Sequence, residues 1–160
     1  KFFENNPSFY FVIIGKDLGY KGSPSLDFIN SKLKKNRDKL IYFKEQNHEK
    51  LLPVIKKAEF VLMPSRIENF PNACVEAMSL SKIVIASKGI SFEQLINDKE
   101  NGFLFENANS KDLLKVIEQV LNLPSERKKE IQENAKKIVE RLHPDITVNK
   151  LINYYQSIIK

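Results

Sequence analysis

The sequence predicts an α/β fold in which helices cover both faces of a parallel sheet. Short apolar runs alternate with helix-like segments along the 160 residues. The runs are continuously apolar, as expected of strands that are buried on both faces. Strands that alternate with helices at short intervals are typical of βαβ units, which build parallel sheets.

The first part of the chain predicts three strands and two helices. Pro24 precedes the first helical segment, and the apolar residues within it recur at helical spacing. Pro53 fits the second helix only in its first turn, where the missing N–H has no intrahelical partner to lose. The predicted strands are 9–14, 40–43 and 60–63, and the predicted helices are 25–36 and 47–57.

The remainder of the chain predicts two more strands and a series of helices. Asn72 is a natural N-cap for the first of these helices, and prolines separate the last three. We expect one domain over 1–160, with C-terminal helices from about 125 to 160. The predicted strands are 83–86 and 103–105, and the predicted helical segments are 72–80, 92–96, 110–121, 125–142 and 146–159.

Composition narrows the class of protein. Lys and Arg number 26 against 20 Asp and Glu, for a net charge of +6. These cations are interleaved with Glu and Asn rather than with aromatic residues, which favours solvated helix faces over a nucleic-acid surface. No apolar run is long enough to cross a membrane.

Cysteine and histidine usage argues against disulfides and metal sites. Cys74 is the only cysteine, so we expect a small buried hydrophobe in a reducing, cytoplasmic setting. His48 and His143 lack the close spacing of paired zinc ligands. The sequence therefore predicts no metal site.

Two glutamates are the strongest candidates for a binding site. Glu68 follows the strand at 60–63, and Glu76 lies seven intervening residues later, in the helix that begins near Asn72. Ligands of parallel sheets bind beyond the carboxyl ends of the strands, so we expect both carboxylates near one cleft. Carboxylates accept hydrogen bonds from vicinal hydroxyls, and a helix N-terminus favours a pyrophosphate. The pattern suits a sugar nucleotide, although such a pair alone is common by chance.

The segment 60–87 resembles the glycosyltransferase group 1 family, which has the GT-B architecture. The motifs are Met-Pro-Ser at 63–65, Glu68, Phe70 and Glu-Ala-Met at 76–78. Flanking segments are similar too, and the resemblance covers nearly the whole chain. These flanking segments are VIIG at 12–15, IVIAS at 83–87, Glu93 and NGFLF at 101–105.

The resemblance implies a Rossmann-like, donor-binding C-terminal half of a retaining glycosyltransferase. Glu68 would be the catalytic residue that contacts donor-sugar hydroxyls, and Glu76 would bind the ribose. Segment 43–46 would lie beside the base. Family members generally need neither a metal nor another cofactor. The further donor-binding residues implied are Asn69, Phe70, Asn72, Ala73, Gly15 and Lys16.

Some positions depart from the family pattern. The family has glycines where Asn69 and Pro71 stand, and Pro71 has no N–H to donate. The family's domain also opens with a strand and a cationic pair, neither of which is found before Lys1. Because that strand is central in a doubly wound sheet, we expect the first strand to be missing and part of the core to be exposed.

The function implied is transfer of a hexose from a UDP- or GDP-type nucleotide sugar. The acceptor would be a glycan or a lipid-linked molecule, in bacterial cell-surface polysaccharide synthesis. The partners expected are the nucleotide sugar, the acceptor and a missing N-terminal domain of the same enzyme, without nucleic acid. Contact with the inner face of the plasma membrane is a further option, and the chain alone is expected to be inactive.

Two alternatives stay open. The chain could be a nucleotide-sugar-binding fragment without activity, or part of a GT-B-type nucleotide-sugar epimerase. An epimerase needs further acid–base residues, which the sequence does not reveal. A flavodoxin-like cofactor domain is disfavoured because Gly15, Gly19 and Gly22 do not match G-x-G-x-x-G.

Overall fold

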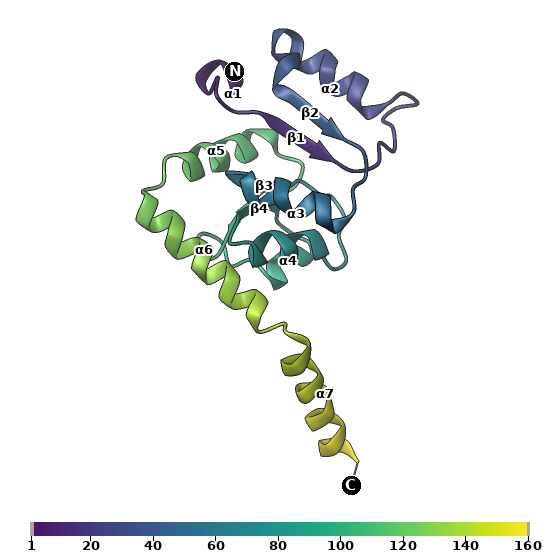
Figure 1. Cartoon of the computed structure of the whole chain (residues 1–160), viewed down its shortest axis with the longest axis vertical. Helices are drawn as coiled ribbons and strands as arrows, with labels where there is room; N and C mark the ends of the chain where they lie inside the picture. The colour runs from purple at the N-terminus through teal and green to yellow at the C-terminus, as the bar shows by residue number, and fades with distance from the viewer. Residues whose placement is uncertain (1, 160) are drawn as a thin grey trace. The chain divides into compact units, whose positions relative to one another are not determined.

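The computed structural model describes residues 2–159, and the chain divides into two compact units, Lys1–Pro53 and Val54–Lys160. The sequence predicted a single domain over 1–160. The five strands of the described residues form two sheets rather than one, and every strand pair is parallel, as predicted (Figure 1).

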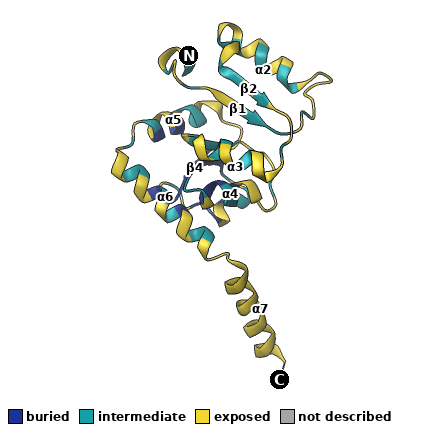
Figure 2. Ribbon diagram, in the orientation of Figure 1, coloured by how far each residue is buried: buried dark blue, intermediate teal, exposed yellow. Residues whose placement is uncertain are grey.

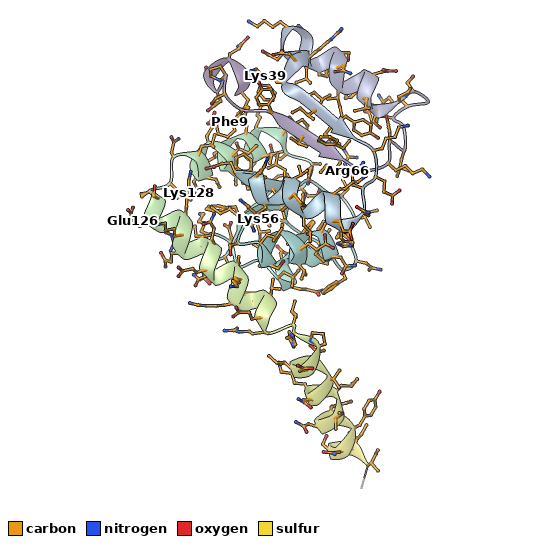
Figure 3. The ribbon with its side chains drawn as sticks, viewed as in Figure 1. Phe9, Lys39, Lys56, Arg66, Glu126 and Lys128 are labelled. Atoms are coloured by element: carbon orange, nitrogen blue, oxygen red, sulfur yellow. The ribbon has the colours of Figure 1, made fainter. Side chains whose placement is uncertain are left out.

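The unit Lys1–Pro53 contains a two-stranded sheet. In β1 and β2, Phe11 lies opposite Leu40 and Ile14 lies opposite Phe43. In Figure 3, Lys39 is labelled; its Nζ donates to the Pro7 carbonyl at 2.7 Å and lies over the Tyr10 ring. The elements are α1 (Phe2–Asn5), β1 (Phe11–Ile14), α2 (Ser25–Leu33), the 3₁₀ helix η1 (Lys34–Lys39), β2 (Leu40–Phe43) and most of α3 (His48–Lys57).

The prediction that the first strand is buried on both faces was wrong. Phe11 and Val12 are 36% and 38% exposed, and no described residue of Lys1–Pro53 is buried (Figure 2). β1 has a single neighbouring strand in its sheet. A continuous apolar run marks a strand, but neighbouring elements determine whether it is buried.

Two helices of this part differ from the prediction. The helix predicted over 25–36 ends at Leu33, because Lys34 adopts a φ of 52° and a 3₁₀ helix follows. Pro53 is the sixth residue of α3 and therefore lies inside the helix rather than in its first turn. Its missing N–H leaves the carbonyl four residues earlier without its intrahelical donor.

The unit Val54–Lys160 contains a three-stranded sheet in the order β3-β4-β5. Phe60 lies opposite Ile83, and Ile85 lies opposite Phe103, so β4 is paired along both edges. The elements are β3 (Phe60–Met63), α4 (Asn72–Ser79), β4 (Ile83–Ser87), the 3₁₀ helix η2 (Ser91–Gln94), β5 (Phe103–Phe105), α5 (Ser110–Leu121), α6 (Ser125–Glu140) and α7 (Pro144–Ile158).

Both faces of β4 are covered. Val84 and Ile85 point to opposite faces of the sheet, and both are 0% exposed. Helix α4 packs with α6 and β4, and the buried residues gather on these central elements (Figure 2). One core cluster contains Cys74, Ala77, Met78, Val84, Ala86, Phe92, Leu95, Ile96, Leu104 and Ala135.

Cys74 is the buried hydrophobe that the sequence predicted. It is 0% exposed, and its Sγ lies 3.6 Å from the Met78 sulfur. Burial raises the pKa of the Cys74 thiol to about 12. The side chain therefore stays a neutral thiol and packs as an apolar group.

Helix α7 exposes its apolar residues. Every residue of Pro144–Ile158 is exposed, and Tyr154 is 61% exposed. The helix begins at Pro144, two residues before the predicted start, with Pro144 in the first helical position. Within residues 2–159, no helix is long and apolar enough to span a membrane.

Candidate functional site

The carboxyl ends of β3 and β4 bring two loops together. Because these strands are parallel neighbours, the segment after β3 and the segment after β4 emerge at the same edge of the sheet. An open cavity of about 520 Å³ lies there. Its lining residues are Glu68, Asn69, Gly89, Ile90, Ser91, Glu93 and Gln94.

The cavity has an acidic and hydrogen-bonding lining. Glu68 and Glu93 contribute carboxylates, Asn69 and Gln94 contribute amides, and no lysine, arginine or histidine lines it. Its volume falls within the roughly 300–1,000 Å³ typical of small-molecule sites. Because ionised carboxylates only accept hydrogen bonds, this lining suits a ligand that is rich in hydroxyl donors.

Glu68 lies where the sequence predicted it, in the loop after β3. The side chain is half-buried, and its Oε1 accepts a hydrogen bond of 3.1 Å from the Asn69 backbone N–H. Arg66, which is labelled in Figure 3, is exposed in the same loop and does not line the cavity. Asn107 donates to the Arg66 carbonyl at 3.5 Å.

Two buried serine hydroxyls lack hydrogen-bond partners. The Oγ atoms of Ser87 and Ser91 are inaccessible to solvent and have no partner among the described residues. A buried hydroxyl without a partner destabilises a fold and calls for an explanation, such as a functional role. Ser91 belongs to the cavity lining, so one of these two residues lies at the candidate site.

The prediction that Asn72 caps α4 was wrong. Pro71 is the N-cap residue, and in the part of the chain that the structure describes it provides no side-chain cap hydrogen bond to α4. The Pro71 carbonyl accepts from Cys74 N–H at 2.9 Å, while Asn72 N–H donates to the Phe70 carbonyl at 3.0 Å. Two amides near the helix start are thus already bonded. Those of Phe70 and Ala73 have no acceptor among the described residues.

Glu76 lies in the second turn of α4 and is half-buried. It shares a helix face with the exposed Asn72 and Ser79, as the sequence predicted, and the Ser79 hydroxyl donates to the Glu76 carbonyl oxygen at 2.7 Å. The cavity lining contains Glu68 but not Glu76. The two carboxylates that were predicted near one cleft therefore do not share this cavity.

Gly15 and Lys16 follow β1 in the unit Lys1–Pro53. Gly15 has a φ of 146°, its N–H donates to the Phe43 carbonyl at 3.1 Å, and its own carbonyl accepts from the Tyr42 hydroxyl at 2.8 Å. Lys16 is exposed. Phe43, in the segment expected beside the base, is 41% exposed.

Asp17 holds the loop that follows, and sequence reasoning did not identify it. Its carboxylate accepts from the backbone N–H groups of Gly19 and Ser25 at 2.9 Å and of Leu26 at 3.3 Å. These hydrogen bonds, with those from Gly19 and Ser25 the strongest, lower the pKa of Asp17 to about 2. The signal in the sequence that could have identified this role is an Asp that precedes the start of a predicted helix by a few residues.

Sequence reasoning found only part of the second wall of the cavity. The loop 87–91 was expected at the ligand-binding edge of the sheet, but Gln94 was not a candidate, and Glu93 appeared only as part of the family resemblance. Their position after the predicted strand 83–86 was the available signal, because parallel neighbours end at one edge. Among residues 2–159, no group of three His, Cys, Asp or Glu side chains is placed to hold a metal ion.

The fold and the site define an α/β domain with an acidic cavity at the carboxyl edge of a parallel sheet. Residues 1–138 match the model of the family described as glycosyl transferases group 1. The match covers most of the chain, which therefore belongs to this family.

Curated relatives agree with this assignment. The chain is 27% identical over 150 residues to an uncharacterized glycosyltransferase of Methanocaldococcus jannaschii, covering 94% of this chain and 41% of the relative. It is 35% identical over 65 residues to an uncharacterized glycosyltransferase of Haemophilus influenzae, covering 39% of this chain and 18% of the relative. The chain thus spans less than half of either relative.

Solved structures show the same α/β, Rossmann-like fold, which is that of GT-B glycosyltransferases. A glycosyltransferase from Rickettsia africae matches with a TM-score of 0.80 at 21% identity, over 96% of this chain and 41% of that protein. Anabaena HepE in complex with UDP matches with a TM-score of 0.80 at 20% identity, over 94% of this chain and 41% of that protein. At these identities the likeness concerns the fold.

Proposed function

We propose that the chain is the donor-binding part of a retaining hexosyltransferase. The enzyme would move a sugar from a UDP- or GDP-type nucleotide sugar to a glycan or lipid-linked acceptor. One observation carries the proposal: Glu68 lines an acidic cavity at the carboxyl ends of two parallel strands. In open α/β sheets this edge is where ligands bind.

The proposal gives each of the predicted donor-binding residues a role. Glu68 is the catalytic residue, and its carboxylate accepts hydrogen bonds from donor-sugar hydroxyls. Glu76 accepts from the ribose hydroxyls. The N–H groups of Phe70 and Ala73, which have no acceptor among the described residues, donate to the phosphates at the start of α4. The further donor-binding residues are Asn69, Asn72, Gly15 and Lys16.

The comparison with HepE supports a nucleotide sugar as the ligand. That protein was solved with UDP and also with UDP-glucose, the latter structure matching 94% of this chain with a TM-score of 0.78. The same proposal places the enzyme in the bacterial cytoplasm, in cell-surface polysaccharide synthesis, and has it transfer the sugar without a metal. It also includes an N-terminal domain as a partner and no activity for this chain alone.

Isothermal titration of the chain with UDP, GDP and AMP tests the proposal. We expect UDP or GDP to bind and AMP to bind more weakly. Glu76→Ala should make the binding free energy of the nucleoside diphosphate less favourable by roughly 1.5–3 kcal/mol, which is the scale of hydrogen bonds to a charged group. Glu68→Ala should leave the affinity for UDP or GDP nearly unchanged, but it should lower the affinity for the intact nucleotide sugar.

Glu118→Ala is the matched control, since Glu118 is exposed on α5 and outside the cavity lining. It should leave all affinities unchanged. Equal binding of the three nucleotides, or binding of none, would contradict the proposed function. A loss of UDP affinity that is as large for Glu68→Ala as for Glu76→Ala would contradict the assigned roles.

A further inference from the structure

The cavity lining contains a second carboxylate besides that of Glu68. Glu93 lies in the short helix η2, which follows β4, and its side chain is exposed. Its backbone N–H donates to the Ile90 carbonyl at 3.3 Å, which holds η2 on the loop. Glu68 and Glu93 thus come from loops after two different strands and line one cavity.

Nearby cations do not neutralise this cavity from within. Lys88 comes directly before Gly89, but its Nζ lies 3.0 Å from a Glu106 carboxylate oxygen, and Lys88 is not a lining residue. Arg66, two residues before Glu68, is not a lining residue either. The lining therefore contributes two negative side-chain charges and no positive one.

We propose that Glu93 determines donor specificity by charge, so that the cavity takes a neutral sugar and rejects a uronic acid. This inference rests on the proposed function, because it takes the cavity as the sugar subsite. A neutral hexose or N-acetylhexosamine donates hydroxyl hydrogens to both carboxylates. The carboxylate of a hexuronate donates none, and it is repelled by Glu68 and Glu93.

Coulomb's law sets the size of the effect. Two like charges roughly 6 Å apart, at an effective dielectric of about 40, correspond to about a tenfold loss of affinity. The diphosphate charge is common to both donors, so it cancels in their ratio. Because the cavity is open to solvent, added salt should reduce the discrimination.

The test compares UDP-glucose with UDP-glucuronic acid by isothermal titration at low and high ionic strength. GDP-mannose and GDP-mannuronic acid serve as the matching pair for a guanosine donor. We expect the acidic donor to bind about tenfold more weakly at low ionic strength. Glu93→Gln should narrow this gap severalfold while affinity for UDP or GDP alone stays unchanged.

Two further variants separate charge from structure. Glu93→Asp keeps the charge and should keep most of the gap, whereas Glu118→Gln removes an exposed charge outside the cavity lining and should leave it unchanged. Equal binding of neutral and acidic donors, or an unchanged gap in Glu93→Gln, would overturn the inference while the proposed function stands. Failure of every nucleotide and donor to bind would overturn the proposed function, and this inference with it.

Discussion

The two units of the chain are built alike but differ in burial. Each contains parallel strands joined through helices, and β1 and β4 have similar apolar sequences, FVII and IVIAS. β1 pairs with one strand and has no buried residue, whereas β4 pairs with two strands and is buried throughout. Strand pairing along both edges, together with helices over both faces, makes an apolar strand part of a core.

The largest test of this comparison is a matched pair of core substitutions. Ile85→Ala in β4 should lower the free energy of unfolding by about 2–5 kcal/mol, because Ile85 is 0% exposed and a cavity would remain. Ile13→Ala in β1 should lower the free energy of unfolding by less than about 1.5 kcal/mol, because Ile13 is only half-buried. Urea denaturation followed by circular dichroism measures both. Equal losses would show that the difference in burial has no energetic consequence.

A smaller effect is expected at the start of α5 in Val54–Lys160. The Asn109 side chain accepts from the backbone N–H groups of Lys111 and Asp112, both at 3.1 Å. Asn109→Ala should lower stability by about 0.5–2 kcal/mol in the same urea assay. Asn109→Ser keeps a capping oxygen and should recover most of the loss. If Ser is no better than Ala, the cap does not stabilise this helix.

Asp17 makes the stability of Lys1–Pro53 depend on pH. Its pKa is lowered from an ordinary value of 3.8 to about 2, so the ionised form binds the loop amides more strongly than the protonated form. The stabilisation is complete above about pH 4 and is lost as the pH falls through about 2. Thermal melts between pH 5 and 2 should show that the melting temperature falls further in the parent chain than in Asp17→Asn.

A direct NMR titration of the Asp17 carboxyl checks the cause of this pH dependence. Glu45→Gln is a suitable control, because Glu45 is an exposed carboxylate of the same unit. The Glu45→Gln substitution, made in both backgrounds, should leave unchanged the difference in pH dependence of the melting temperature between the parent chain and Asp17→Asn. A carboxyl that titrates at its ordinary value would rule out the stabilising role of the three N–H donors.

The smallest effect concerns an ion pair on the surface of Val54–Lys160. Lys128 of α6, labelled in Figure 3, lies 2.9 Å from a Glu59 carboxylate oxygen, and its side chain is 23% exposed. A double-mutant cycle with Lys128→Met and Glu59→Gln should give a coupling of about 0.2–1 kcal/mol that weakens with salt. A coupling as large as the loss in Ile85→Ala would mean that charge pairing rivals the core.

Much of the local structure could be predicted from the sequence. The strands at 40–43, 60–63 and 103–105 and the helix at 110–121 have the predicted bounds. Their signals are local: apolar runs and their period, with caps and turn residues at their ends. The loop position of Glu68 followed from the same signals, and the family resemblance is confirmed by the match over residues 1–138.

The sequence by itself determined where the strands and helices lie and which family the chain belongs to. Only the tertiary structure decided that β1 is exposed while β4 is buried, and that Ser91, Glu93 and Gln94 line one cavity together with Glu68. That Pro71 rather than Asn72 is the N-cap of α4 was also decided there. The physical reason is that periodicity depends on neighbours along the chain, whereas burial and a cavity wall depend on segments that are distant in sequence.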